Sequence, residues 1–149
     1  MLLSLLLVYV LYILYMTLLC RTARTFYQYN YKLFWSYQYF FDKDHPQGRQ
    51  ILLNILFFVP YGMLLTAALQ NGKRSGIKVF LITVLSAALL SGLIEFLQLV
   101  LKLGFSEFDD VMDNTIGATI GTGISILLIS FIDKVRKKHE KETGERQNL

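Results

Sequence analysis

The chain has 149 residues, of which 54% are hydrophobic and 17% are charged, and its mean hydropathy is +0.43. Charged residues make up about a quarter of an ordinary soluble domain, so this composition argues against a soluble protein and predicts a membrane protein. The formal net charge of +4 does not indicate a nucleic-acid partner, because the basic residues lie beside apolar runs and in a tail of mixed charge, where they suit anionic lipid headgroups.

Four segments are long and apolar enough to cross a hydrocarbon core about 30 Å thick, which takes about 20 helical residues. They lie at residues 2–20, 51–69, 79–101 and 115–132, and Glu95 in the third is the one charged residue among them. The sequence therefore predicts an all-α fold, an integral membrane bundle of four transmembrane helices. We expect one domain over residues 1–149, ending in a charged tail at 133–149.

The first apolar run has no Lys or Arg before it and no small-residue cleavage site after it. We therefore expect a retained transmembrane helix and not a secretion signal. Cys20 is the single cysteine and allows no internal disulfide, so we interpret it as a small apolar side chain at the end of this helix.

The first outward loop is rich in aromatic residues, with ten of them in residues 26–41. Rings with one apolar and one polar end favour the headgroup zone, so we expect this loop to lie along the outer membrane interface. We favour an anchor that covers the helix ends over the alternative, a stacking surface for a sugar or an aromatic ligand.

Four spans place both termini on the same side as the loop between the second and third spans. That side carries nine Lys and Arg residues, against six on the other side that are spread over a longer stretch. Because basic segments tend to stay in the cytoplasm, we predict a multi-pass protein of the cell membrane with both termini cytoplasmic.

The second and fourth spans carry residues that shape helices. Pro60 in the second span frees a backbone carbonyl and favours a kink, with Gly62 just after it, which would open space next to Asn54. In the fourth span, Gly117 and Gly121 form a G-x-x-x-G pattern that lets another helix approach closely. We expect Asp113 or Asn114 to be the N-cap of this helix.

The third span has one polar face. Ser91, Glu95 and Gln98 lie at positions i, i+4 and i+7, which share a helix face. A carboxylate facing lipid at a helix centre costs on the order of 3 kcal/mol, so Glu95 should point into the bundle or a wet cavity. Two basic residues near the outer side are candidate partners for it, Arg49 and Lys102.

Polar residues from three spans converge at one depth. With a rise of 1.5 Å per residue, Asn54 lies about 5 Å from the outer end of its span, and Glu95 and Gln98 about 9 and 5 Å from theirs. Asp113 and Asn114 open the fourth span at the same face. This convergence predicts a common site in the outer half of the bundle.

Four carboxylates precede the last span closely, at Glu107, Asp109, Asp110 and Asp113. We expect helix caps and a solvated acidic loop. A Ca²⁺ or Mg²⁺ site and a paired acid/base device remain alternatives, although the spacing matches no EF-hand loop. We predict no metal and no cofactor, and the sequence contains none of the common soluble-enzyme motifs, such as a CxxC pair or HExxH.

Three motifs in this order resemble those of a known family. "NILFFVPYGMLL" is similar to the N-x-x-x-F-x-P-x-G signature of VanZ-like membrane proteins, "IEFLQ" to their I-E-x-x-Q helix, and "FDDVMDNTIGATIG" to their D-D-x-x-x-N-T-x-G-x-x-x-G stretch. The aromatic "NYKLFWSYQYF" also resembles the segment before these motifs. Many members carry an arginine shortly before the aspartates, where "LGFSEFDD" has none, so no role of that arginine is carried over.

The resemblance implies a small bacterial integral membrane protein, related to one linked with low-level resistance to teicoplanin, a lipoglycopeptide that acts on cell-wall precursors. Six polar positions match the motifs and form the candidate functional cluster: Asn54, Glu95, Gln98, Asp109, Asp110 and Asn114. Four more match as helix-packing positions: Pro60, Gly62, Gly117 and Gly121.

Three hypotheses follow. We favour a non-enzymatic cell-envelope protein whose outward polar pocket, beneath the aromatic segment, binds a lipid-linked or lipoglycopeptide ligand, with membrane lipids as its other partners. The alternatives are a membrane enzyme acting on a lipid or cell-wall precursor, with Glu95 and Asp109 or Asp110 as acid/base groups or metal ligands, and a cluster that only holds the helices together.

Overall fold

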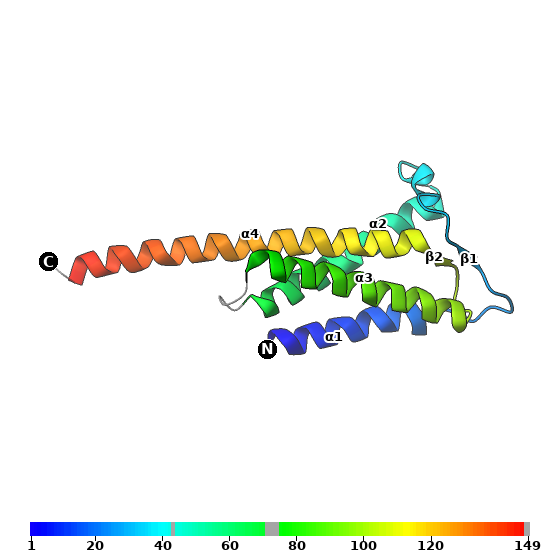
Figure 1. Ribbon diagram of the computed structural model, residues 1–149, viewed down its shortest axis with the longest axis horizontal. Coiled ribbons are helices and arrows are strands. Elements are labelled where there is room, and N and C mark those ends of the chain that lie inside the picture. The colour runs from blue at the N-terminus through cyan, green and yellow to red at the C-terminus, as the bar shows by residue number, and fades with distance from the viewer. Residues whose placement is uncertain (43, 71–74, 148–149) are drawn as a thin grey trace.

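The computed structural model describes residues 1–42, 44–70 and 75–147, with side chains described up to residue 140. It confirms the all-α prediction, since the chain is 77% helical and four helices are long and apolar enough to cross a membrane. These are α1 (Leu2–Leu14), which continues as a π-helical segment at Tyr15–Leu19, α2 (Pro46–Leu69), α3 (Gly76–Val100) and α4 (Phe108–Gln147) (Figure 1).

Three helices begin earlier than the apolar runs that predicted them, and α3 does so by three residues, at Gly76. α2 begins at Pro46, where the His45 side chain accepts a hydrogen bond from the Gln47 N–H and Pro46 suits the first helical position. α4 begins at Phe108, so the prediction that Asp113 or Asn114 is the N-cap is wrong: both lie in the second turn. The predicted bounds followed the loss of charged residues, whereas helix formation does not require an apolar sequence.

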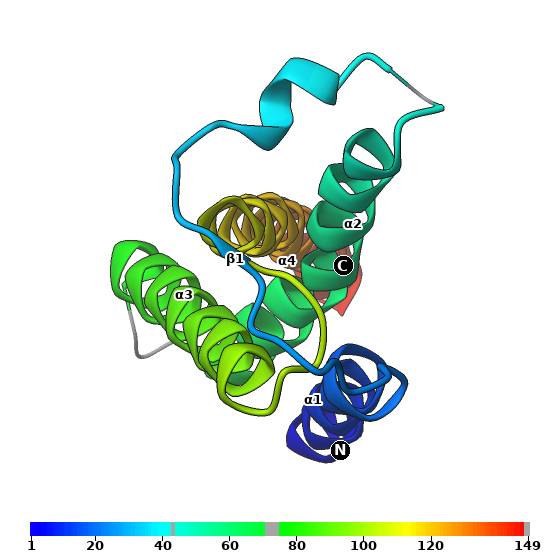
Figure 2. The same cartoon turned by 90° about the vertical axis from the view of Figure 1, so that its right-hand side faces the viewer.

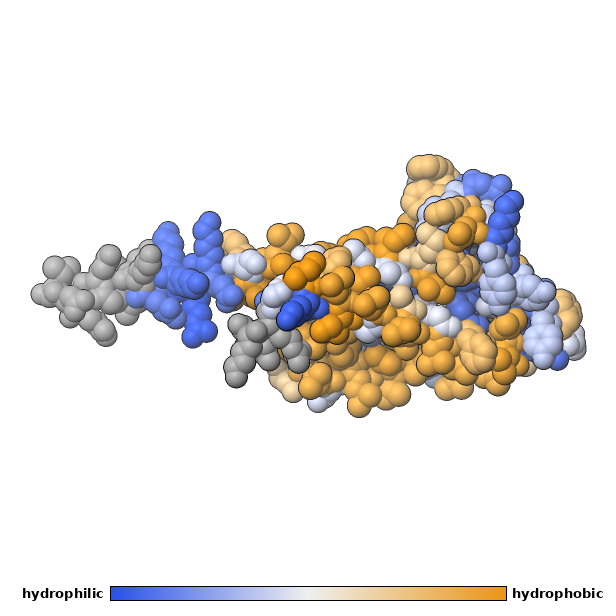
Figure 3. Space-filling view, in the orientation of Figure 1, coloured by the Kyte–Doolittle hydropathy of each residue, from blue (hydrophilic) through white to orange (hydrophobic). Residues whose placement is uncertain are grey.

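The face of the helical bundle seen in Figure 3 is largely apolar. Along α3, the side chains of Leu85, Leu89 and Leu93 are 62%, 75% and 51% exposed. Exposed leucines at this density are unfavourable in water but normal when lipid is the solvent, because lipid tails are as apolar as leucine.

α2 and α4 are in backbone contact at three glycines. A Cβ atom added at Gly62 would lie 2.2 Å from the Ala118 carbonyl oxygen, and one at Gly121 would lie 2.0 Å from the Val59 carbonyl oxygen. At Gly117 the corresponding distance, to the Ile55 carbonyl oxygen, is 2.1 Å. Only glycine allows this approach, and the resulting contact sets the position of α2 relative to α4, the two helices that carry most of the site. α2 stays helical through Pro60.

α1 packs on α2 through its tyrosines and one isoleucine. The Tyr9 hydroxyl donates a hydrogen bond to the Phe57 carbonyl oxygen at 2.7 Å, and the Tyr12 ring stacks on the Phe57 ring at 5.9 Å. Ile13 is fully buried at the same contact. α1 thereby closes one side of the space next to α2.

Both termini lie at one end of the bundle. The aromatic segment between the π-helical segment and α2 lies at the other end, together with the α3–α4 connection (Figure 1). At that second end, β1 (Tyr29–Asn30) pairs in parallel with β2 (Ser106–Glu107), as Figure 2 shows from that side. A 3-10 helix at Ser36–Tyr39 follows. The pairing of β1 with β2 ties the aromatic segment to the residues just before α4. It was not predicted from the sequence.

Candidate functional site

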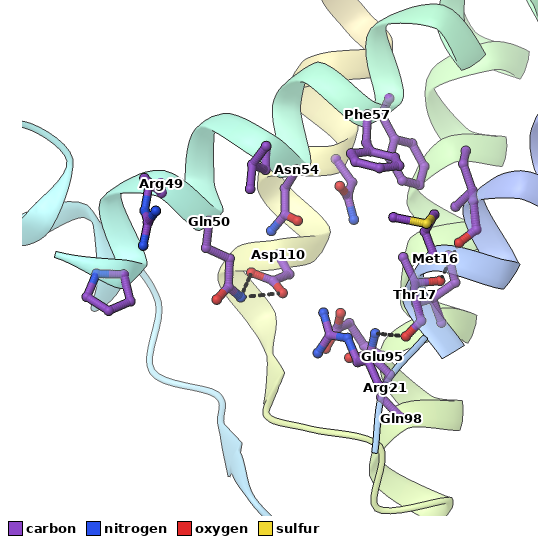
Figure 4. Close-up of a pocket in the computed structure, with 16 residues that line it drawn as sticks. Met16, Thr17, Arg21, Arg49, Gln50, Asn54, Phe57, Glu95, Gln98 and Asp110 are labelled. Atoms are coloured by element: carbon purple, nitrogen blue, oxygen red, sulfur yellow. Dashed lines mark hydrogen bonds between the residues drawn. The ribbon is translucent and has the colours of Figure 1, made fainter. Parts of the chain in front are cut away.

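A cavity of about 360 Å³ lies near the end of the bundle that carries the α3–α4 connection, since Arg21, Gln98 and Asp110 line it. α1 with its π-helical extension, α2, α3, α4 and Arg21 all contribute to its wall (Figure 4). The apolar part of the lining consists of Ile13, Met16, Pro46, Leu53, Phe57, Phe58 and Ile94, and the polar part of Thr17, Arg21, Arg49, Gln50, Asn54, Glu95, Gln98, Asp110 and Asn114. The cavity is therefore amphipathic.

Five of the six predicted cluster residues line this one cavity: Asn54, Glu95, Gln98, Asp110 and Asn114. Asp109 does not, because it faces the aromatic segment on the other side of α4. Asp109 and Asp110 are neighbours on a helix and point about 100° apart, since an α-helix has 3.6 residues per turn. The structure thus separates two aspartates that the sequence motif groups together.

Two of the cluster residues also join helices. The Asn114 amide donates a hydrogen bond to the Ser91 hydroxyl at 2.7 Å, which links α4 to α3. The Gln98 amide donates to the Thr17 carbonyl oxygen at 3.1 Å, which links α3 to the π-helical segment (Figure 4). These contacts contribute to packing as well as to the cavity wall.

Asn54 and Gln98 each have an unsatisfied polar atom in the wall. Within the part of the chain that the structure describes, the Asn54 Nδ2 and the Gln98 Oε1 are buried without a hydrogen bond of normal geometry. A buried polar atom without a partner costs about 1–3 kcal/mol. Both residues line the cavity, while these two atoms themselves are buried.

Glu95 is buried, with one oxygen accepting a hydrogen bond from the Glu107 N–H at 2.9 Å. Of the two candidate partners, the Lys102 ammonium instead lies over the Tyr27 ring, 4.6 Å from its centroid, and Arg49 lies at the exposed rim of the cavity. The basic side chain drawn beside Glu95 in Figure 4 is Arg21. The sequence analysis missed this role because it used Arg21 only as evidence for orientation.

Gln50 is the second residue that the sequence analysis missed. Its amide Nε2 lies 2.9 Å from one Asp110 oxygen, 3.1 Å from the other, and 2.9 Å from a Glu107 oxygen. The signal available in the sequence was weak: a glutamine directly before an apolar run, as Arg21 is an arginine directly after one. Gln50 holds the acidic end of α4 against α2.

The prediction of a solvated acidic loop is wrong. Glu107, Asp109, Asp110 and Asp113 are only 1%, 0%, 4% and 0% exposed. They are buried because distant parts of the chain supply donors to them, which a local pattern does not reveal. Within residues 1–42, 44–70 and 75–147, no group of three or more His, Cys, Asp or Glu side chains is placed to hold a metal ion.

Asp109 and Asp113 fasten the aromatic segment to α4. The Asp109 carboxylate accepts hydrogen bonds from the Phe34 N–H at 2.7 Å, the Ser36 N–H at 3.0 Å and the Ser36 hydroxyl at 2.7 Å. The Tyr37 hydroxyl donates to Asp113 at 2.6 Å. Burial, together with this bond and the nearby aspartates, raises the pKa of Tyr37, so the phenol remains a donor.

The aromatic segment therefore packs on α4 and does not roof the cavity, whose wall comes from the helices and Arg21. The expectation of a pocket beneath an aromatic cover is wrong in this respect. Phe26, Tyr29 and Phe41 are 59%, 59% and 92% exposed, which suits a position at a membrane interface.

Glu107 lies between the carboxyl groups that line the cavity and those that hold the aromatic segment. Burial is the main cause that raises the pKa of Glu107 to about 8, and the charges of Asp110, Glu95 and Asp109 add to it. The hydrogen bond from Gln50 acts in the opposite direction and lowers this pKa. Glu107 therefore holds its proton at neutral pH, which reduces the negative charge beside the cavity.

A family model described as VanZ/LLP1 matches residues 5–129 of the chain. The matched range contains every residue of the cavity wall, from Ile13 to Asn114. No curated protein and no solved structure matches the chain.

Proposed function

Because the chain belongs to the VanZ/LLP1 family, we propose that it is a non-enzymatic, multi-pass protein of the bacterial cell membrane that binds an amphiphile of the cell envelope. The ligand is a lipid-linked cell-wall precursor or a lipoglycopeptide such as teicoplanin. Binding would lower the access of the antibiotic to its target or assist maintenance of the wall.

The observation that carries this proposal is the amphipathic wall of the cavity. Ligand cavities of roughly 300–1,000 Å³ with a mainly apolar lining and a few directed polar groups are typical of small-molecule sites. Leu53 and Phe57 supply an apolar side here, and Asn54, Glu95 and Gln98 supply polar side chains. Cytoplasmic termini would place the opening in the outer half of the membrane, where lipid-linked precursors and lipoglycopeptides meet.

Asn54→Leu tests the binding role separately from packing. The change keeps the approximate side-chain volume but removes an amide that lacks a normal hydrogen bond, so the protein should melt at the same temperature or higher. If that amide binds the ligand, affinity should fall by up to about tenfold, the equivalent of one hydrogen bond. The measurements are melting in detergent, binding of a lipid-linked precursor and of teicoplanin in nanodiscs, and teicoplanin susceptibility at equal expression.

Leu85→Ala, on the lipid-facing side of α3, is the control for effects of a substitution on the membrane-embedded protein that do not involve the cavity. It should leave binding unchanged. If Asn54→Leu and Phe57→Ala both bind ligand as wild type does and both leave teicoplanin susceptibility unchanged, the cluster has a packing role only.

The second candidate function is a membrane enzyme that acts on a lipid or cell-wall precursor. It is favoured by one observation: two carboxyl groups, Glu95 and Asp110, line the same cavity and suit acid/base chemistry. Incubation of the purified protein with labelled precursors and divalent metals should then yield product that Glu95→Gln abolishes. A time course without product in wild type would exclude turnover of those precursors and leave the binding function in place.

A further inference from the structure

A second cavity of about 370 Å³ adjoins the first and shares Arg21 and Gln50 with it. Its polar wall also includes Thr22, Arg24 and Gln47. The two cavities differ in charge. Among the described residues that line the second cavity there are two arginines and no Asp or Glu, whereas Glu95 and Asp110 line the first.

The Arg21 guanidinium group lies close to the backbone of the α3–α4 connection. Gly104 has a φ of +122°, and a Cβ atom added there would lie 2.7 Å from the Arg21 Nη1. Glycine at this position therefore permits both the loop conformation and the close approach of the guanidinium group. The Arg21 side chain lies at the boundary of the two cavities as a result.

The start of α2 adds to the positive potential of the second cavity. Gln47 and Gln50 lie in the first two turns of this 24-residue helix, and both line the cavity. The N-terminal end of a helix carries a partial positive charge that favours anions. Two guanidinium groups, a helix N-terminus and the Gln47 amide form a surface that matches a phosphate group, because guanidinium binds phosphate through paired N–H donors.

We infer that the second cavity holds the phosphate group of an amphiphile whose alkyl chain lies in the first cavity, with Arg21 between the two. This inference rests on the proposed function and names its ligand class: a phosphate-bearing lipid. It selects a lipid-linked cell-wall precursor, which is joined to its lipid through phosphate, over a lipoglycopeptide.

The test compares probes with one alkyl chain and different headgroups on the full chain in nanodiscs of an uncharged, phosphate-free diacyl glycolipid. The probes are dodecyl phosphate, uncharged dodecyl glucoside and inorganic phosphate, with empty nanodiscs as the blank. Wild type should bind dodecyl phosphate about tenfold more tightly than dodecyl glucoside, because hydrogen bonds between charged groups are the strong ones. Inorganic phosphate, which lacks the chain, should bind more weakly than dodecyl phosphate.

Arg21→Gln should lower the affinity for dodecyl phosphate by about tenfold, and by clearly more than the affinity for dodecyl glucoside, so that the preference for phosphate is lost. Arg21→Lys keeps the charge and should retain part of the preference, and it serves as the second variant if the glutamine protein does not fold. Lys32→Gln is the matched control, since Lys32 is an exposed cation of the same outward segment that lines neither cavity. It should behave as wild type.

The outcomes separate the two proposals. Saturable binding of dodecyl phosphate and dodecyl glucoside with equal affinity would overturn the phosphate inference and leave the proposed function standing. Inorganic phosphate that binds as tightly as dodecyl phosphate would show a free-anion site and overturn the link to an alkyl chain. Absence of saturable binding of both alkyl probes would overturn the proposed function as well.

Discussion

Gln50 connects the acidic residues of α4 to the cavity through a single amide group. Its Nε2 has two protons but lies within hydrogen-bond distance of three carboxyl oxygens, two of Asp110 and one of Glu107. The other Glu107 oxygen is buried and has no partner within the described residues. Burial is the main physical reason that the pKa of Glu107 is raised and its proton retained, and the hydrogen bond from Gln50 offsets this only in part.

This arrangement predicts a pH dependence of stability. The folded protein raises the pKa of Glu107 from 4.5 to about 8, so its contribution to stability is fully present below pH 4.5 and is lost as pH rises through about 8. The melting temperature in detergent should therefore fall across this window. Glu107→Gln imitates the protonated side chain and should make the fall shallower.

Glu140→Gln is the control for this measurement, because Glu140 is exposed on the far part of α4, in an ion pair with Arg136. It should keep the wild-type pH profile. Identical profiles for wild type and Glu107→Gln would show that Glu107 is ionised throughout the range.

At the scale of elements, the crossing of α2 and α4 decides where the cavity lies. Gly62, Gly117 and Gly121 bring the two backbones into contact, and the cavity residues Asn54 and Asn114 lie on the same two helices. A wider crossing would move the α2 part of the wall away from the α4 part. The small residues of the sequence motif thereby support the polar ones.

Gly121 and Gly123 of α4, about half a helical turn apart, provide a matched test of this contact. Gly121→Ala would place a methyl group 2.0 Å from the Val59 carbonyl oxygen, so the helices must separate, and overpacking of this kind costs about 1–3 kcal/mol. Gly123→Ala meets no atom within 4 Å and should be neutral or stabilising by up to about 1 kcal/mol through helix propensity. The measurements are melting temperature in detergent and yield of folded protein.

The contact would be shown to be unimportant if both alanine variants melted at the wild-type temperature. A loss in Gly123→Ala equal to that in Gly121→Ala would mean that glycine is needed along α4 for another reason, such as contact with a second membrane component.

At the scale of the whole molecule, the four helices place the termini at one end and the candidate site at the other (Figure 1). The basic residues near the termini favour the cytoplasm for that end. The candidate site would then face the outside of the cell, which is the side on which glycopeptides act.

Cys20 allows a direct test of this orientation, because it is the single cysteine of the chain and it is exposed at the end of α1 near the candidate site. A membrane-impermeant maleimide should label it in intact cells. In a Cys20→Ser background, Lys137→Cys on the exposed far part of α4 should be labelled only after permeabilisation. The reverse pattern would place the candidate site in the cytoplasm and contradict the proposed encounter with external ligands.

The sequence by itself determined the four helices and five of the nine polar residues in the cavity wall. An apolar run of about 20 residues has helix as its stable form in lipid, because each backbone polar group must be satisfied within the segment. A polar side chain in such a run needs a partner, so Asn54, Glu95 and Gln98 stood out without any knowledge of the packing.

Only the tertiary structure decided which of these residues act together. The Phe34 and Ser36 donors to Asp109 lie 75 and 73 positions away in the chain, and Gln50 lies 60 positions from Asp110. A local pattern contains no information on the register between such distant segments, so it favoured a solvated loop where the fold buries four carboxyl groups. The same limit applied to Arg21, whose place between two cavities depends on the approach permitted by Gly104.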